Sequence, residues 1–151
     1  MRKILLTMLV TSLLWADSAA ARLQIFACEP EWGALPSELG GELVSVFTAT
    51  TAQQDPHHSQ ARPALIAQLR RADLAICTGA ELEAGWLPML QRRANNPRTA
   101  PGSLGFLEAA AQGELLERPQ RLDRADGDVH ASGNPHLHLD PRNIARVAAA
   151  L

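Results

Sequence analysis

Short apolar runs alternate with amphipathic segments along most of the chain, which is typical of strand–helix–strand units. The runs expected to form buried strands cover residues 23–28, 42–49 and 73–79. The segments expected to form helices cover residues 30–41, 61–72 and 80–94, the last bent at Pro88. This alternation predicts an α/β fold in which a parallel sheet carries helices on both faces. Ligands of such sheets bind at the loops that follow the carboxyl ends of the strands.

The C-terminal third of the chain is less regular. Residues 95–105 and 120–135 are rich in turn-forming residues and are expected to be loops. Residues 106–119 are ambiguous, and we interpret them as a short helix followed by an edge strand. A last helix is expected to begin at Asp140, because this residue is a good N-cap and Pro141 suits the first helical position.

The first residues have the order of a secretory signal peptide. Two basic residues precede an apolar run at 4–16, and the three alanines at 19–21 fit a cleavage site of the A-x-A type. The run is too short to cross a bilayer of about 30 Å as a helix. We expect residues 1–21 to be removed on export to the periplasm and residues 22–139 to form one domain.

Charge and cysteine usage narrow the choice of partners and compartments. Removal of Arg2, Lys3 and Asp17 with the signal peptide leaves 12 Lys and Arg against 15 Asp and Glu side chains. This acidic balance provides no basic surface, so no nucleic-acid partner is expected. Cys28 and Cys77 each end an expected strand, and the sequence leaves a disulfide and two buried thiols equally open.

All five histidines lie in two short windows, "QDPHHSQARP" and "GDVHASGNPHLHLDP". In each window a proline directly precedes a histidine and a helix start follows, namely Pro56 before His57 and Pro135 before His136. This arrangement holds the imidazole on a constrained backbone, and neutral imidazole is a common ligand of zinc. The repeated arrangement favours His57 and His136 as metal ligands.

The other three histidines are weaker candidates. His138 lies two residues from His136 and would share its face on an extended chain, although packing beneath the last helix is the favoured role. His130 lies in an Asp- and Gly-rich loop and could cap an open site, although a solvated side chain is expected. His58 is expected to point away from His57. Three carboxylates could support the site or simply form turns: Asp55, Asp126 and Asp128.

The stretch "DPHHSQARPALIAQLRRADLAICTGAELEAGWLPML" followed by "GNPHLHLDPRNIARVAAAL" resembles the zinc/manganese-type solute-binding proteins of bacterial ABC transporters. The resemblance implies a periplasmic receptor, not an enzyme, that captures Zn²⁺ with high affinity, or Mn²⁺ or another divalent ion, and delivers it to an ABC permease at the inner membrane. The histidines of "DPH" and "NPH" are metal ligands in that family, which implies the same role for His57 and His136. A bulky residue, often Trp, commonly stands at the position of His138.

The family consists of two α/β lobes joined by a long helix, with the metal between the lobes. The resemblance covers the first lobe and, at 140–151, the start of that helix. The second lobe, with its usual His or Glu and Asp ligands, has no counterpart, so we expect a fragment with half of a metal site. Because zinc prefers four ligands, we expect weak, easily chelated binding. An uncovered apolar helix face would favour self-association through the terminal helix.

Two other functions fit parts of the sequence. An exported zinc-dependent hydrolase would use an open coordination position, but it needs a carboxylate base, and the chain has no HExxH motif and no Glu within either histidine window. A metal-independent, adhesin-like interaction domain would use the histidines structurally. Thermal stability that zinc and EDTA leave unchanged would favour that second alternative.

Overall fold

A computed structural model of the chain describes residues 21–123, 125, 127 and 129–151. The expected signal peptide, apart from its last residue, and the two candidate carboxylates Asp126 and Asp128 lie outside the described residues. The main elements are β1 Leu23–Ala27, α2 Pro30–Gly40, β2 Val44–Thr48, α3 Pro63–Arg71, β3 Leu74–Cys77, α4 Leu87–Ala94, β4 Phe106–Glu108, α5 Ala109–Gln112 and α6 Pro141–Ala150. None of the described helices is long and apolar enough to cross a membrane.

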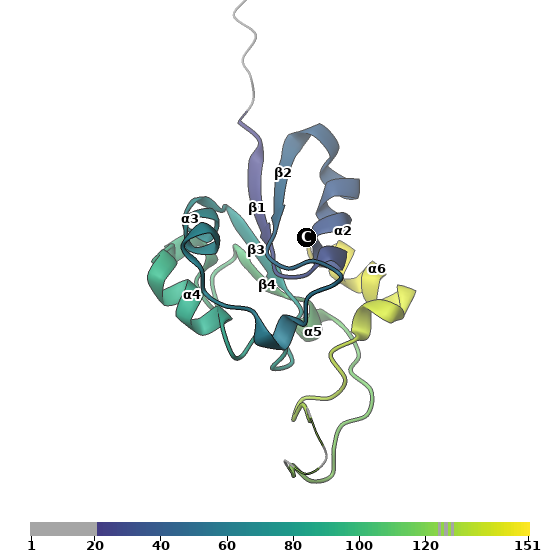
Figure 1. Ribbon diagram of the computed structural model, residues 1–151. Helices are drawn as coiled ribbons and strands as arrows, with labels where there is room; N and C mark the ends of the chain where they lie inside the picture. The colour runs from purple at the N-terminus through teal and green to yellow at the C-terminus, as the bar shows by residue number, and fades with distance from the viewer. Residues whose placement is uncertain (1–20, 124, 126, 128) are drawn as a thin grey trace, which may run out of the picture.

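The four strands form one parallel sheet in the order β2-β1-β3-β4 (Figure 1). Ile25 of β1 pairs with Val46 on one side and Leu74 on the other, and Ile76 of β3 pairs with Leu107. The expected α/β fold with a parallel sheet is therefore confirmed.

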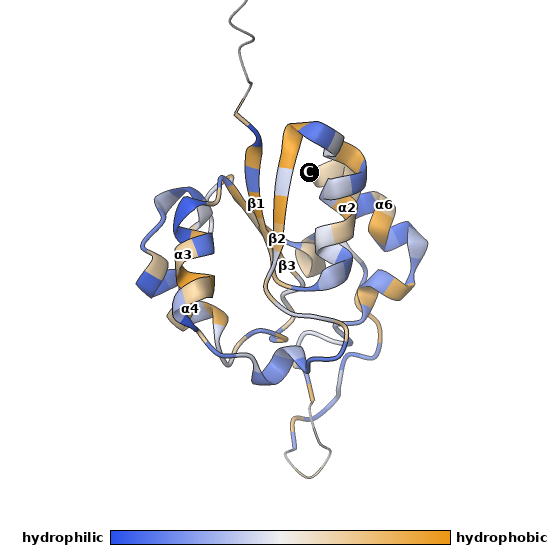
Figure 2. Ribbon diagram, turned by 45° about the horizontal axis from the view of Figure 1, so that its top comes forward, coloured by the Kyte–Doolittle hydropathy of each residue, from blue (hydrophilic) through white to orange (hydrophobic). Residues whose placement is uncertain are grey.

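Helices cover both faces of the sheet, with α3 and α4 on one face and α2 and α6 on the other (Figures 1 and 2). Side chains of successive strand residues point to opposite faces, so each face has its own apolar core. Phe26 of β1 faces the α3–α4 core, where Leu69 and Leu90 are buried. Ile25 faces the α2–α6 core together with Trp32 and Val147. The centre of the sheet is thus shielded on both sides.

Cys28 and Cys77 form a disulfide between the carboxyl ends of β1 and β3. Both side chains are fully buried. Of the two alternatives that the sequence left open, the structure shows the disulfide. It joins adjacent strands directly beneath the loops that follow them.

The terminal helix α6 packs on the domain instead of exposing its apolar face. The Asp140 carboxylate accepts a hydrogen bond from the backbone N–H of Arg142 at 2.9 Å, which confirms the expected N-cap. Val147 is fully buried, and Ile144 packs against the same core. The expectation of an exposed apolar face is therefore wrong, because α2 and α5 already cover it. Self-association remains a prediction without that support.

Two segments differ from their sequence-based assignments. The helix expected at 80–94 begins only at Leu87, so Pro88 lies in its first turn and does not bend it. Residues 80 and 81 have positive φ angles of 50° and 64°, which no helix contains. At 106–119 the order is reversed, since β4 precedes the short helix α5. A three-residue strand carries too little periodicity to be recognised from sequence.

Candidate metal centre

Three of the five histidines line one open cavity of about 390 Å³. His57 comes from the loop between β2 and α3, and His130 and His136 come from the loop that precedes α6. The first of these loops follows the carboxyl end of a strand, as expected for ligand binding in a parallel sheet. Glu117 lies on the wall of the same cavity.

Asp55 holds the imidazole of His57 in a defined orientation. Its Oδ1 accepts hydrogen bonds from the backbone N–H of His57 at 2.9 Å and from the ring Nδ1 at 2.8 Å. With Nδ1 donating, the neutral ring carries its lone pair on Nε2, which is the atom available to a metal. A carboxylate in this position also makes the imidazole a more basic ligand.

The same carboxylate binds both histidines of the first window. Its Oδ2 accepts from Nδ1 of His58 at 2.8 Å. The hydrogen bonds from the His57 ring and then from the His58 ring hold the pKa of Asp55 well below its usual range. Asp55 is therefore ionised, and its negative charge faces the ring that would bind a cation.

Asn134 holds His136 in the way that Asp55 holds His57. Its Oδ1 accepts from the backbone N–H of His136 at 3.0 Å and from the ring Nδ1 at 2.8 Å. The Asn134 amide in turn donates to Oε2 of Glu117 at 2.7 Å, which fixes which way the amide points. His136 therefore also presents Nε2 as its free acceptor.

Sequence reasoning missed Asn134 and Glu117 as parts of this site. The signal for Asn134 was present, because both windows have the pattern Asx-Pro-His. In each copy the side-chain oxygen of the first residue accepts hydrogen bonds from the backbone N–H and the ring Nδ1 of the histidine. Nothing comparable marked Glu117, which lies in the segment whose structure the sequence left ambiguous.

His130 lies directly against His57. The Nε2 atoms of the two rings are 3.0 Å apart, and the ring centroids are 5.1 Å apart. The expectation of a solvated loop histidine is thus not met. Since Nδ1 of His57 donates to Asp55, the Nε2–H of His130 donates to the lone pair of His57. Two nitrogens bound to one tetrahedral zinc at 2.0–2.1 Å lie about 3.3 Å apart, so this pair is already near ligand spacing.

The remaining two histidines, His58 and His138, do not line the cavity. His58 has a side chain that is 76% exposed, and the 3₁₀ turn at Pro56–His58 turns it toward Asp55 instead of directing it away on an extended chain. His138 lies with Nδ1 3.2 Å from Oε1 of Glu31 and packs edge-on against Trp32. His138 therefore has a packing role, but against α2 and not beneath the last helix as the sequence favoured.

The three cavity histidines still have to draw together to close around one ion. Among the described residues, the group of three ligand side chains within 4.8 Å of one another is Cys28, Cys77 and Glu83, and not the histidines. The two sulfur atoms of that group are bonded to each other, so it offers no thiolate. His136 shares the cavity with the His57–His130 pair but makes its hydrogen bonds to Asn134.

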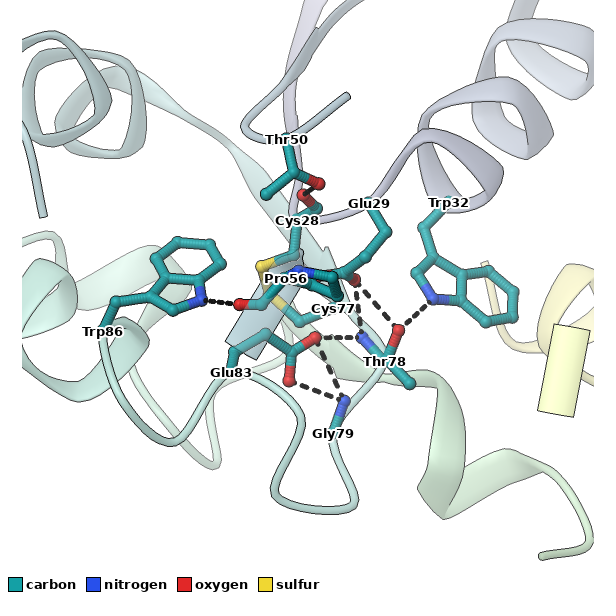
Figure 3. The surroundings of a disulfide bond; sticks show 10 residues. All are labelled: Cys28, Glu29, Trp32, Thr50, Pro56, Cys77, Thr78, Gly79, Glu83 and Trp86. Atoms are coloured by element: carbon teal, nitrogen blue, oxygen red, sulfur yellow. Dashed lines mark hydrogen bonds between the residues drawn. A yellow bond between two sulfur atoms is a disulfide. The ribbon is translucent and has the colours of Figure 1, made fainter. Parts of the chain in front are cut away.

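Two buried carboxyl groups, Glu29 and Glu83, lie beside the disulfide (Figure 3). Glu83 accepts from the backbone N–H of Thr78 at 2.7 Å and of Gly79 at 3.1 Å, and Glu29 accepts from the Thr78 hydroxyl at 2.9 Å. Burial raises the pKa of Glu29 well above its usual value, and the neighbouring charge of Glu83 raises it further. Burial also raises the pKa of Glu83.

Solved structures of metal-binding receptors share this fold. A zinc-bound 138-173 deletion mutant of ZnuA is 25% identical, with a TM-score of 0.67 over 86% of this chain and 44% of that one. Zn(II)-bound AdcA from Streptococcus pneumoniae is 17% identical, with a TM-score of 0.63 over 86% of this chain and 25% of that one. A Mn-bound periplasmic metal binding protein from Candidatus Liberibacter asiaticus is 19% identical, with a TM-score of 0.64 over 83% and 42%.

The chain spans less than half the length of these solved structures. No curated protein matches its sequence significantly. The sequence profile of the family described as "Zinc-uptake complex component A periplasmic" (ZnuA) matches residues 25–151. The match covers most of the chain, which therefore belongs to the ZnuA family of periplasmic metal-binding receptors.

Proposed function

We propose that this chain captures Zn²⁺ in the periplasm and delivers it to an ABC permease at the inner membrane. His57, His136 and His130 are the proposed ligands, each through Nε2. For His130 this requires the proton that its Nε2 donates to His57 to move to Nδ1 or leave the ring. The observation that carries this proposal is the 3.0 Å approach of the His57 and His130 Nε2 atoms in a cavity that His136 also lines.

The side chains around the proposed ligands suit a dipositive ion. Asp55 and Asn134 each accept a hydrogen bond from the Nδ1–H of one ring, which leaves the Nε2 lone pair for the metal. The ionised Asp55 adds a negative charge close to the ion without occupying a coordination position. Imidazole nitrogens favour zinc over manganese, which prefers sites rich in carboxylates. A three-histidine set leaves the fourth position of a tetrahedral ion for water or a further ligand.

Transport requires export and release as well as capture. We propose that residues 1–21 direct export, that 22–139 form the metal-binding lobe, and that the helix at 140–151 corresponds to the start of the inter-lobe helix of the family's receptors. The open cavity allows the ion to leave toward a partner without unfolding of the lobe. The expectation of weak, chelatable binding stays a prediction, and calorimetry that shows tight 1:1 binding by a monomer would contradict it.

The hydrolase alternative has one supporting observation, because a carboxylate does lie beside the histidines. Glu117 lines the cavity, but its Oε2 accepts a hydrogen bond from Asn134. This contact makes Glu117 a support for the His136 window. We therefore favour capture over catalysis.

Zinc titration of single variants tests the proposed ligands. Chelator competition should show that His57→Ala and His136→Ala each lose at least about 100-fold in zinc affinity. Loss of a residue that only supports a ligand costs about 10- to 100-fold. His130→Ala should also weaken binding, whereas His138→Ala is the matched control and should bind as the wild type does. Equal affinity of wild type and His57→Ala would reject the site.

A further inference from the structure

The turn between β3 and α4, residues 79–86, contacts both histidine windows. At its end the indole Nε1 of Trp86 donates a hydrogen bond to the backbone oxygen of Pro56 at 2.8 Å (Figure 3). The preceding Gly85 lies so close to the same loop that an added Cβ would be 3.1 Å from the backbone oxygen of His57. This turn therefore holds the Pro56–His57 peptide by a hydrogen bond and lies close against the carbonyl of His57.

The beginning of the 79–86 turn holds the other window. The Glu81 carboxylate accepts from the backbone N–H of Ser132 at 3.2 Å and from its hydroxyl at 2.7 Å. Ser132 lies in the tight turn that His130 opens, because the N–H of Gly133 donates to the His130 oxygen at 3.1 Å. Glu81 thus fixes the chain two residues from His130.

The 79–86 turn is itself anchored to the sheet. Glu83 is 2% exposed and accepts from the N–H groups of Thr78 and Gly79, where β3 ends. The backbone of the turn passes through the left-handed region at Ala80 and Glu81, with φ angles of 50° and 64°. Non-glycine residues adopt this region at a cost, so surrounding contacts must hold the turn in its shape.

We propose that the 79–86 turn is the element that sets His57 against His130, and that Trp86 and Glu81 are its positioning residues. Neither residue would touch the ion. The two windows are 73 residues apart in sequence at their contact, and this turn bonds to both. Trp86 sets the position of the first ring and Glu81 that of the second. This inference rests on the proposed metal site, but the contact between the two rings that it explains is present in the structure itself.

Two tryptophan variants separate positioning from general stability. Trp86→Phe removes the hydrogen bond to Pro56 and keeps an aromatic ring. Trp32→Phe is the matched control, because its Nε1 donates to the Thr78 hydroxyl at 2.7 Å and its side chain is fully buried like that of Trp86. Both variants should lower the melting temperature to a similar extent. Only Trp86→Phe should weaken Zn²⁺ binding, by about 10-fold, as supporting contacts of metal ligands do.

Glu81→Ala provides a test that does not depend on the buried core, because the contacts of Glu81 to Ser132 are exposed. Nitrogen–nitrogen coupling between the His57 and His130 rings, measured by NMR without metal, reports the contact directly. The coupling should be present in the wild type and in Trp32→Phe and be lost in Trp86→Phe and Glu81→Ala. Retained coupling together with wild-type Zn²⁺ affinity in both turn variants would overturn the inference. If the wild type binds no Zn²⁺, the proposed function fails, while the coupling still decides whether the turn positions the two rings.

Discussion

Removal of the Asp55 carboxylate should weaken zinc binding while leaving the fold intact. Two of the three hydrogen bonds that the Asp55 carboxylate accepts come from His57, at 2.9 Å from the backbone and 2.8 Å from the ring. Asp55→Ala therefore frees the ring to rotate and lets the proton move to Nε2. Loss of such a supporting group costs about 10- to 100-fold in metal affinity. The side chain is 52% exposed, so the melting temperature should change little.

The molecule offers two internal comparisons for this prediction. Asp55→Asn gives the first window the residue type that the second window has at Asn134. There, one amide oxygen accepts from both the backbone N–H and the ring Nδ1 of His136. This variant should keep much of the affinity that Asp55→Ala loses. His58→Ala removes only the third hydrogen bond of the carboxylate and should bind nearly as the wild type does.

The assay is competition of each purified variant with a fluorescent zinc chelator at pH 7.5, paired with a thermal melt in EDTA. The predicted order of affinity is wild type and His58→Ala first, then Asp55→Asn, then Asp55→Ala. The reasoning is refuted if Asp55→Ala binds zinc as tightly as the wild type while His57→Ala does not, because ring orientation would then be irrelevant to ligation.

Three further predictions concern stability. Burial raises the pKa of Glu29 above 4.5, so above this pH the folded state holds a proton that the unfolded state loses. The free energy of unfolding of the wild type should therefore fall as the pH rises above this value. Urea unfolding of Glu29→Gln, which cannot ionise at this position, should show a flatter pH profile. The Cys28→Ala/Cys77→Ala double variant should lose about 4 kcal/mol of unfolding free energy by the chain-entropy model, since the bridge spans 49 residues; an unchanged denaturation midpoint would contradict this. Val147→Ala should cost about 2 kcal/mol and the exposed Leu139→Ala close to nothing; equal melting temperatures would mean that α6 does not pack on the domain.

The fold was largely predictable because the apolar runs are short, well separated and bounded by turn residues. β1, β2 and β3 and the helices between them lie within the expected segments. The errors fall where specific hydrogen bonds override the preference of the local sequence. Residues 80–86 have a helical composition, but the hydrogen bonds of Glu83 to Thr78 and Gly79 hold them in a turn whose first two residues are left-handed. β4 forms because Ala75 and Cys77 of β3 supply its pairing partners.

The site was predictable only in part, because sequence shows which windows are alike but not which side chains meet. The repeated proline and histidine pointed to His57 and His136. The contact of His57 with His130 depends on the path of a loop that Glu81 holds from a distant part of the chain. Similarly, the place of Glu117 in the cavity follows from tertiary structure alone.

The proposed site requires that His57, His130 and His136 converge on one ion while His58 and His138 do not. Long-range ¹H–¹⁵N NMR of the histidine rings during zinc titration tests this directly, because coordination shifts the resonance of the ligating nitrogen. The Nε2 resonances of His57, His130 and His136 should shift together and saturate at one equivalent of zinc, with the other two rings unchanged. A shift of His58 or His138 in place of His136, or saturation of His57 and His136 at different zinc ratios, would contradict the proposed site.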